Sequence, residues 1–213
     1  MTWLEIRGTT LATARAVAAL ARMVSDDDLG KPALGSWNVG GLGGHLLRAL
    51  RTPVRYLEEP EPVGEPLASA AAYFAGYLGW RAEDPESADA RVAARGAAEL
   101  PTTSAVVLEE AFAEAAVALE MIDHMDAGRI VPSLFGPIRL DDYLRTRIFE
   151  MSVHGLDLAA ALDEDWAPPP AAVAHSLTLL AECSMLIGTG AHLLLELTGR
   201  AVPVSVSAIP VIR

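Results

Sequence analysis

The sequence is poor in the residues that mark several large classes of protein. Its 213 residues include a single cysteine, Cys183, which excludes an internal disulfide framework. Lysine also occurs once, at Lys31, and the 16 basic residues face 28 acidic ones, for a formal net charge of -12. Because nucleic acid is bound through clustered basic residues, this charge balance makes nucleic acid an unfavourable partner.

Long hydrophobic runs are missing too. The longest apolar runs, such as 193–195, are far too short to span a bilayer, and no basic amphipathic stretch predicts a helix on a membrane surface. Residues 1–7 lack the basic-then-apolar order of a signal peptide. We therefore expect a cytoplasmic protein without a membrane partner.

The pattern of the remaining residues predicts an all-α fold. Hydrophobic residues make up 52% of the chain, which is enough for the core of one domain. Apolar residues recur at helical spacing between proline and glycine breaks, and Asn38 and Asp141 are the expected N-caps of two long helices. The predicted helices cover 8–24, 38–58, 67–82, 86–98, 102–125, 141–162, 171–187 and 191–198, with a loop or short extended pair at 128–140.

These helices are expected to form one bundle over residues 1–200. Four or more of them are long, and binding sites in such bundles form between facing helices. Residues 201–213 contain alternating apolar positions, which predict either a strand or an extended C-terminal tail.

A glutamate and a histidine four residues apart are the most informative feature of the chain. Glu150 and His154 lie in the predicted helix 141–162, so their side chains share one face and are one turn apart. Two such groups can bind one metal ion, as the two histidines of a zincin helix do. A catalytic zinc takes three protein ligands, and His45 is a candidate for the third.

The same residues also have an interpretation without a metal. A histidine on an apolar helix face is commonly a hydrogen-bonded core residue, and Glu150 could pair with Arg147 or Arg48. A second pair, His192 and Glu196, has the same separation in reverse order, but no third ligand is evident beside it. Spacing alone leaves the metal and metal-free interpretations open.

Two motifs carry a family resemblance. The first is Trp-Asn-Val-x-x-Leu-x-x-His-Leu at 37–46, and the second is Arg-x-x-Glu-x-x-x-His-Gly-x-Asp-Leu at 147–158. Together they resemble the signatures of the mycothiol-dependent maleylpyruvate isomerase family, within the DinB-like metalloprotein superfamily. The resemblance implies a DinB-like four-helix bundle with extra short helices, in which His45, Glu150 and His154 bind a divalent metal.

The resemblance also implies a function. Mycothiol or a similar small thiol would be the cosubstrate, and the metal would be Zn²⁺ or, alternatively, nickel, iron or manganese. A divalent metal favours the thiolate of a bound thiol, and the thiolate would attack a small electrophile. We therefore expect a metal-dependent S-transferase or isomerase-like enzyme. The alternatives are a non-catalytic metal- or ligand-binding or sensor protein on the same bundle, and a metal-free bundle. A homodimer is compatible with the sequence.

Two other residues of the second motif each have two possible roles. Arg147 could bind a substrate carboxylate or pair with Glu150, and the pairing is favoured. Asp157 could orient a metal ligand, or it could be an ordinary exposed aspartate.

Cys183 is expected to be buried and not a nucleophile. The 13 residues after Arg200 are too few for the C-terminal α/β domain of the isomerases, so isomerisation of maleylpyruvate itself is doubtful.

Four glycines depart from the family pattern. They fill the turns before His45, at positions 40, 41, 43 and 44, where each costs a helix about 1 kcal/mol relative to alanine. Their missing side chains could leave room for a ligand or for a tightly packed neighbour. Alternatively, they mark a poorly formed first turn that tertiary packing holds in place.

Overall fold

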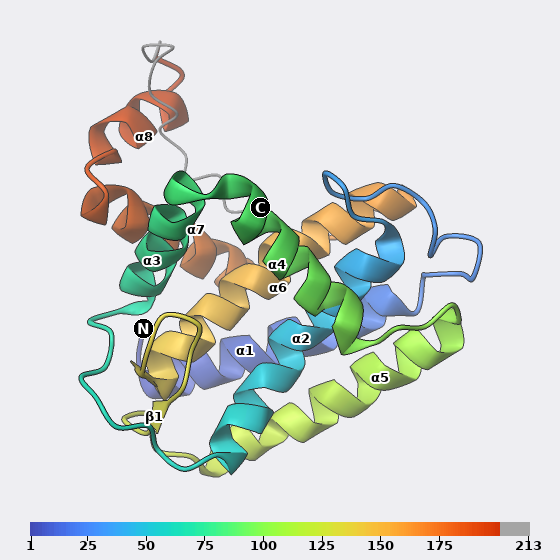
Figure 1. Ribbon diagram of the computed structural model, residues 1–213, viewed down its shortest axis with the longest axis horizontal. Helices are drawn as coiled ribbons and strands as arrows, with labels where there is room; N and C mark the ends of the chain where they lie inside the picture. Colours follow the sequence, from blue (N-terminus) through green and yellow to red (C-terminus); the bar gives the residue numbers. More distant parts are fainter. Residues whose placement is uncertain (201–213) are drawn as a thin grey trace.

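The protein is all-α, as predicted. The computed structural model describes residues 1–200, so the strand or tail expected at 201–213 lies outside the described residues. No helix in the described part combines the length and apolar character needed to cross a membrane. The elements are α1 (Trp3–Ala21), α2 (Val39–Glu58), α3 (Ala70–Glu83), α4 (Pro85–Glu99), α5 (Ala105–Ala118), the 3-10 helix η1 (Leu119–His124), β1 (Ile130–Val131), β2 (Ile138–Arg139), α6 (Leu140–Leu162), α7 (Pro170–Leu186) and α8 (Gly190–Leu197) (Figure 1).

Four long helices, α1, α2, α5 and α6, form the central bundle. Helices α1 and α2 each pack against both α5 and α6, which closes the bundle around a shared core. The core is built from fully buried side chains of each helix, such as Val17 of α1, Leu46 of α2, Phe112 of α5 and Ile148 of α6. The remaining helices surround this bundle: α4 crosses α2, α3 packs on α7, and α8 lies at one end beside α7 (Figure 1).

The ends of α1 and α2 follow from their capping residues. Helix α1 begins five residues earlier than predicted, because Thr2 and Glu5 form a capping box that satisfies the first backbone amides. Helix α2 begins as predicted, and the side chain of Asn38 accepts a hydrogen bond of 2.8 Å from the amide of Gly41. This cap fixes the turn that leads to His45.

The expected cap of the motif helix was wrong. Arg139 is the N-cap residue of α6, and its extended backbone continues from β2, so the helix begins one residue before Asp141. Asp141 lies in the first turn, where it pairs with Arg139 at 2.9 Å and its negative charge favours the helix N-terminus. The predicted extended pair at 128–140 is the β1–β2 hairpin.

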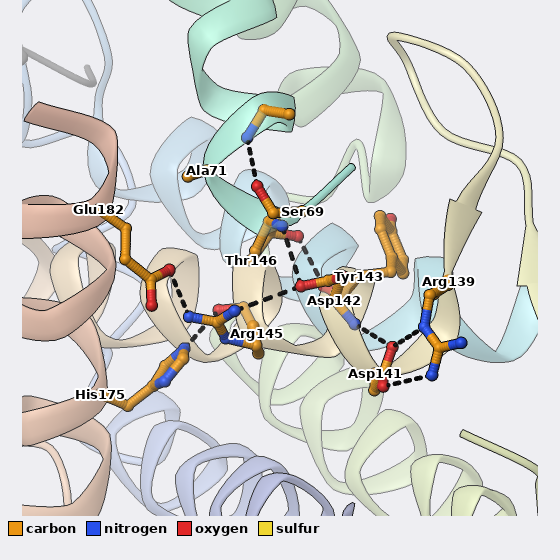
Figure 2. Close-up of polar contacts among 12 residues, drawn as sticks. Ser69, Ala71, Arg139, Asp141, Asp142, Tyr143, Arg145, Thr146, His175 and Glu182 are labelled. Atoms are coloured by element: carbon orange, nitrogen blue, oxygen red, sulfur yellow. Dashed lines mark hydrogen bonds and ion pairs between the residues drawn. The ribbon is translucent and has the colours of Figure 1, made fainter. Parts of the chain in front are cut away.

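A polar network ties α3 and α7 to the start of α6. Asp142 accepts a hydrogen bond of 3.0 Å from the amide of Ala70, and Arg145 pairs with Asp142 at 3.3 Å and with Glu182 at 2.5 Å (Figure 2). His175 of α7 donates a hydrogen bond of 3.1 Å from Nε2 to the carbonyl of Arg145. The bond between Asp142 and Ala70 holds the start of α3, and Tyr73, Phe74 and Tyr77 of this helix line a cavity beside α6.

Candidate metal centre

Two helices bring the three expected ligands together. His45 comes from α2, and Glu150 and His154 come from successive turns of α6. Glu150 Oε2 lies 3.1 Å from His45 Nε2 and 3.5 Å from His154 Nε2. Within residues 1–200, this is the one group of three or more such side chains whose potential ligand atoms all lie within 4.8 Å of one another. The polar edges of all three side chains therefore converge on one point.

The donor set fits a divalent ion. Two ligands that each lie about 2.1 Å from a tetrahedral ion are about 3.4 Å apart, and the two separations from Glu150 to the histidine nitrogens are 3.1 and 3.5 Å. The side chain of His154 is 2% exposed, and those of His45 and Glu150 are 13% and 11% exposed. Such a cluster of two imidazoles and one carboxylate is shielded from bulk water on most sides.

The electrostatics of the cluster keep Glu150 ionised and favour a proton on His154, whereas burial lowers the pKa of His45. Burial by itself would raise the pKa of Glu150, but hydrogen bonds from His154 and His45 and the charge of Arg147 hold it well below its ordinary value. Burial lowers the pKa of His154, yet hydrogen bonds to Asp157 and Glu150 outweigh burial and raise it to about 9. In the metal-free protein a proton on His154 offsets the carboxylate, and a metal cation would have to displace that proton.

Two further residues hold the imidazoles in place. Asp157 accepts a hydrogen bond of 3.0 Å from Nδ1 of His154, which leaves Nε2 of that ring directed at Glu150. The ring of Trp37 lies 4.8 Å from the ring of His45 and 6.1 Å from the ring of His154, measured between centroids. The tryptophan and the aspartate of the two sequence motifs thus both contact the histidines.

The glycines before His45 allow a close crossing of α2 and α4. A Cβ atom on Gly44 would lie 2.3 Å from the carbonyl oxygen of Gly96, and a Cβ atom on Gly96 would lie 2.9 Å from Cβ of His45. A Cβ atom on Gly43 would meet the side chain of Leu108 at 3.3 Å. Of the explanations that the sequence left open, the tightly packed neighbour is correct for Gly43 and Gly44. The crossing places α4 directly beside His45.

The sequence of the chain also matches the model of a known family. The sequence model of the mycothiol maleylpyruvate isomerase N-terminal domain matches residues 10–159. The chain belongs to this family. The match contains both motifs and all three residues of the cluster, and it covers well over half of the 213 residues. Comparisons with curated proteins and with solved structures gave no match.

In this member of the maleylpyruvate isomerase family, the cluster lies at the wall of a cavity of about 340 Å³. The walls come from α2, α3, α4, α6 and the loop between β1 and β2, and His45 and Glu150 are part of the lining. The other lining residues are Arg48, Thr52, Tyr56, Tyr73, Phe74, Tyr77, Val92, Arg95, Ser133, Leu134, Tyr143 and Arg147. Sequence reasoning missed Tyr73 and Arg95, because nothing in the spacing of α3 and α4 links them to the motif helix.

Arg147 lies differently from the favoured expectation. It forms no ion pair with Glu150 among the described residues, although its charge lowers the pKa of that carboxyl group. The guanidinium instead lies 4.9 Å from the ring centroid of Tyr143 and 5.6 Å from that of Tyr73. Tyr143 precedes Arg147 by one helical turn, so the spacing in the sequence could have predicted the contact between this guanidinium and this ring.

The other candidates lie elsewhere. His192 and Glu196 are on α8, at the periphery, and no third potential ligand joins them among residues 1–200. Cys183 is buried, as expected, and burial raises the pKa of its thiol to about 11. The buried thiol therefore stays neutral, which does not suit a nucleophile.

Proposed function

We propose that the protein is a metal-dependent enzyme that uses a small thiol of the mycothiol type to act on a small electrophile. The observation that carries the proposal is the convergence of His45, Glu150 and His154 beside a cavity, with one potential ligand atom of each residue within 4.8 Å of the others. Membership of the mycothiol maleylpyruvate isomerase family supports the thiol. The reaction would be S-transfer, or addition followed by elimination where an alkene is isomerised.

His45, Glu150 and His154 would hold the metal. Zn²⁺ is the first choice for two imidazoles and one carboxylate, with nickel, iron and manganese as alternatives. When bound, such an ion would favour the thiolate form of the thiol, which is the nucleophilic form.

The rest of the chain would position these ligands and the reactants. Asp157 accepts a hydrogen bond from the Nδ1 proton of His154, so that the lone pair of Nε2 would be available to bind the metal. Trp37 packs against both imidazole rings and keeps bulk water from their faces. The thiolate would then form a bond between sulfur and an electrophilic carbon inside a cavity lined by four tyrosines. In S-transfer a leaving group would depart with its electron pair, and in addition the π pair of the C=C bond would move to the neighbouring carbon.

Elemental analysis and a thiol titration test the proposal together. The purified protein should contain one divalent metal ion per chain, and His45→Ala should abolish its binding. His192→Ala is the matched control, because His192 lies on α8 and should leave the metal content unchanged. In Co²⁺-substituted protein, mycothiol or N-acetylcysteine should change the visible absorption spectrum of the metal. A protein without metal, or a spectrum that thiols leave unchanged, would reject the proposal.

Turnover then separates an enzyme from a binding protein on the same bundle. Loss of thiol is followed against a panel of electrophiles, with the metal-loaded protein and with the His45→Ala variant. The enzyme proposal requires thiol-dependent conversion of at least one electrophile by the loaded protein and a large loss in the variant. Metal and thiol binding without any turnover would favour the non-catalytic alternative.

A further inference from the structure

A second cavity, of about 670 Å³, is bounded by the first turns of α1, the first turns of α6 and one side of α7. Among the described residues, its lining shares no member with that of the cavity beside the metal cluster. Its volume is in the range of small-molecule sites. The proposed function makes no use of this second cavity.

Carboxylates outnumber cations in the second cavity. Its lining includes Arg145, the amino-terminal residue Met1 and four carboxylates, those of Glu5, Asp141, Asp142 and Glu182. Arg145 pairs with both Asp142, at 3.3 Å, and Glu182, at 2.5 Å (Figure 2). Glu5 forms no ion pair with any residue in 1–200, although its carboxylate caps α1. Several carboxylate oxygens of the lining therefore remain available to a hydrogen-bond donor.

His175 adds a buried acceptor to these oxygens. It is 4% exposed, and its Nε2 donates a hydrogen bond of 3.1 Å to the carbonyl of Arg145, so the proton of the neutral ring is on Nε2. Its Nδ1 is then an acceptor, and no hydrogen-bond partner for it lies within residues 1–200. Burial lowers the pKa of His175, which keeps the ring neutral. A buried acceptor without a partner is unfavourable, so Nδ1 points to a ligand that carries a donor.

These acceptors are too widely spread for one metal ion. In the described chain, the cluster of His45, Glu150 and His154 is the one group of three whose potential ligand atoms lie within 4.8 Å of one another. The carboxylates of the second cavity come from three helices, and Ile6 and two alanines add apolar surface to its lining. A ligand that satisfies them must be longer than an ion, with N–H donors at its ends and an apolar middle.

We infer that the second cavity binds a small aliphatic polyamine, a chain with two or more ammonium groups. One ammonium group would donate to Nδ1 of His175 and another to the carboxylates of Glu5 and Glu182, since each ammonium has three donors. The methylene chain would lie on the apolar part of the lining. This site requires neither the metal nor the thiol of the proposed function.

Calorimetric titrations with amines of matched length test the ligand class. Putrescine and spermidine are compared with n-butylamine, which has one ammonium group, with uncharged 1,4-butanediol and with Mg²⁺. An ionic strength of about 0.15 M screens the attraction of the acidic surface. Charge-assisted hydrogen bonds at both ends predict that at least one polyamine binds about 10- to 100-fold more tightly than butylamine. Butanediol and Mg²⁺ should bind no more tightly than butylamine.

Two double variants with the same change of charge locate the site. Glu5→Gln with Glu182→Gln should weaken polyamine binding about tenfold, because two charge pairs are lost. Glutamine can still cap α1 at position 5, so the helix start is kept. Glu110→Gln with Glu114→Gln is the control, since both residues are exposed on α5 and neither lines the second cavity. Affinity should stay within about twofold in the control, which leaves the cavity intact.

Nitrogen NMR of the imidazoles tests the role of His175 without a disruptive substitution. The Nδ1 resonance of His175 should shift when the polyamine is added, because this atom begins to accept a hydrogen bond. The resonances of His124 and His192, which do not line the second cavity, should stay in place. His175→Gln assigns the signal, and the other measurements do not depend on that variant.

The outcomes are separable from those of the proposed function. Polyamines that bind no more tightly than butylamine or Mg²⁺ would overturn the ligand class. Equal weakening by the two double variants would indicate attraction to the acidic surface and overturn the site, as would an unmoved Nδ1 resonance of His175. EDTA-treated protein should bind the polyamine as tightly as metal-loaded protein. A chain that binds polyamine but no metal would reject the proposed function and keep this site.

Discussion

The crossing of α2 and α4 makes a sharp prediction about two glycines in one helix. Gly41 and Gly44 are both in the first turns of α2, so replacing either with alanine gains up to about 1 kcal/mol of helix propensity. Their surroundings differ. The new methyl group at Gly41 would meet only the side-chain oxygen of Asn38 at 3.2 Å, and a shift of a few tenths of an ångström relieves this contact while the capping hydrogen bond, now 2.8 Å, stays within range. At Gly44 it would lie 2.3 Å from a backbone carbonyl of Gly96.

The size of the effect follows from these distances. Cβ atoms essentially never approach another heavy atom within 3.0 Å, so at Gly44 the two helices must separate by at least 0.7 Å, the difference between 3.0 and 2.3 Å. Overpacking of this kind costs about 1–3 kcal/mol. Because both substitutions gain the same helix propensity, we expect the unfolding free energy of Gly44→Ala to be lower than that of Gly41→Ala by about 1–3 kcal/mol. For a chain of this size, a difference of about 2 kcal/mol corresponds to about 4–8 °C in Tm.

Thermal and urea denaturation of EDTA-treated protein, followed by circular dichroism, measure the difference without a contribution from bound metal. Gly96→Ala should behave like Gly44→Ala, since its Cβ atom would lie 2.9 Å from Cβ of His45. Both variants should also weaken metal binding, because the displaced helix contacts His45, whereas Gly41→Ala should not. If Gly44→Ala is as stable as Gly41→Ala, the two backbones do not approach as closely as described, and the packing explanation of the glycines is wrong.

Three more predictions concern the surroundings of the cluster. Gly155→Ala should lower the unfolding free energy by about 1–3 kcal/mol in urea denaturation, because its Cβ atom would lie 2.5 Å from the ring of Trp166; the loss should shrink when Trp166→Leu is added. Asp157→Asn should weaken metal binding about 10- to 100-fold in competition with a chelator, because the carboxylate orients His154, and unchanged affinity would contradict that role. Burial raises the pKa of Cys183 to about 11, so its alkylation by iodoacetamide at pH 8 should be slow in the folded protein and fast in urea. In the unfolded chain the thiol ionises from about pH 8.5, whereas in the folded protein it stays neutral, so the free energy of unfolding should fall as the pH rises above about 8.5.

Much of the fold could be predicted from the sequence, for local reasons. The long helices of the bundle have apolar residues at helical spacing, and the breaks between them are marked by proline and glycine. Asn38 is a strong N-cap, and α2 begins after it. The first residue of α6 was harder to predict. Asp141 is a residue type that favours the N-cap, but strand β2 ends at Arg139 and the helix begins directly after it, one residue before Asp141. Tertiary context, which the sequence does not display, decided that boundary.

Some residues of the candidate site could be predicted from the sequence and others could not. His45, Glu150 and His154 could be selected because two lie one turn apart on one helix and the third belongs to a motif. Tyr73 and Arg95 could not, since they come from α3 and α4, whose position over the cavity depends on contacts between distant segments. The close approach of Gly96 to Gly44 is such a contact, and single glycines in a helical pattern do not reveal their partners.

Net charge and local charge lead to different expectations about the ligand. A formal net charge of -12 predicts poor binding of anions, yet the cavity has three arginines and one carboxylate in its lining. At physiological ionic strength, interactions between exposed charges are largely screened beyond about 8 Å, whereas buried groups are screened much less. The guanidinium of Arg147, which forms no ion pair with a carboxylate among residues 1–200, therefore has more influence on a molecule in the cavity than the acidic surface has.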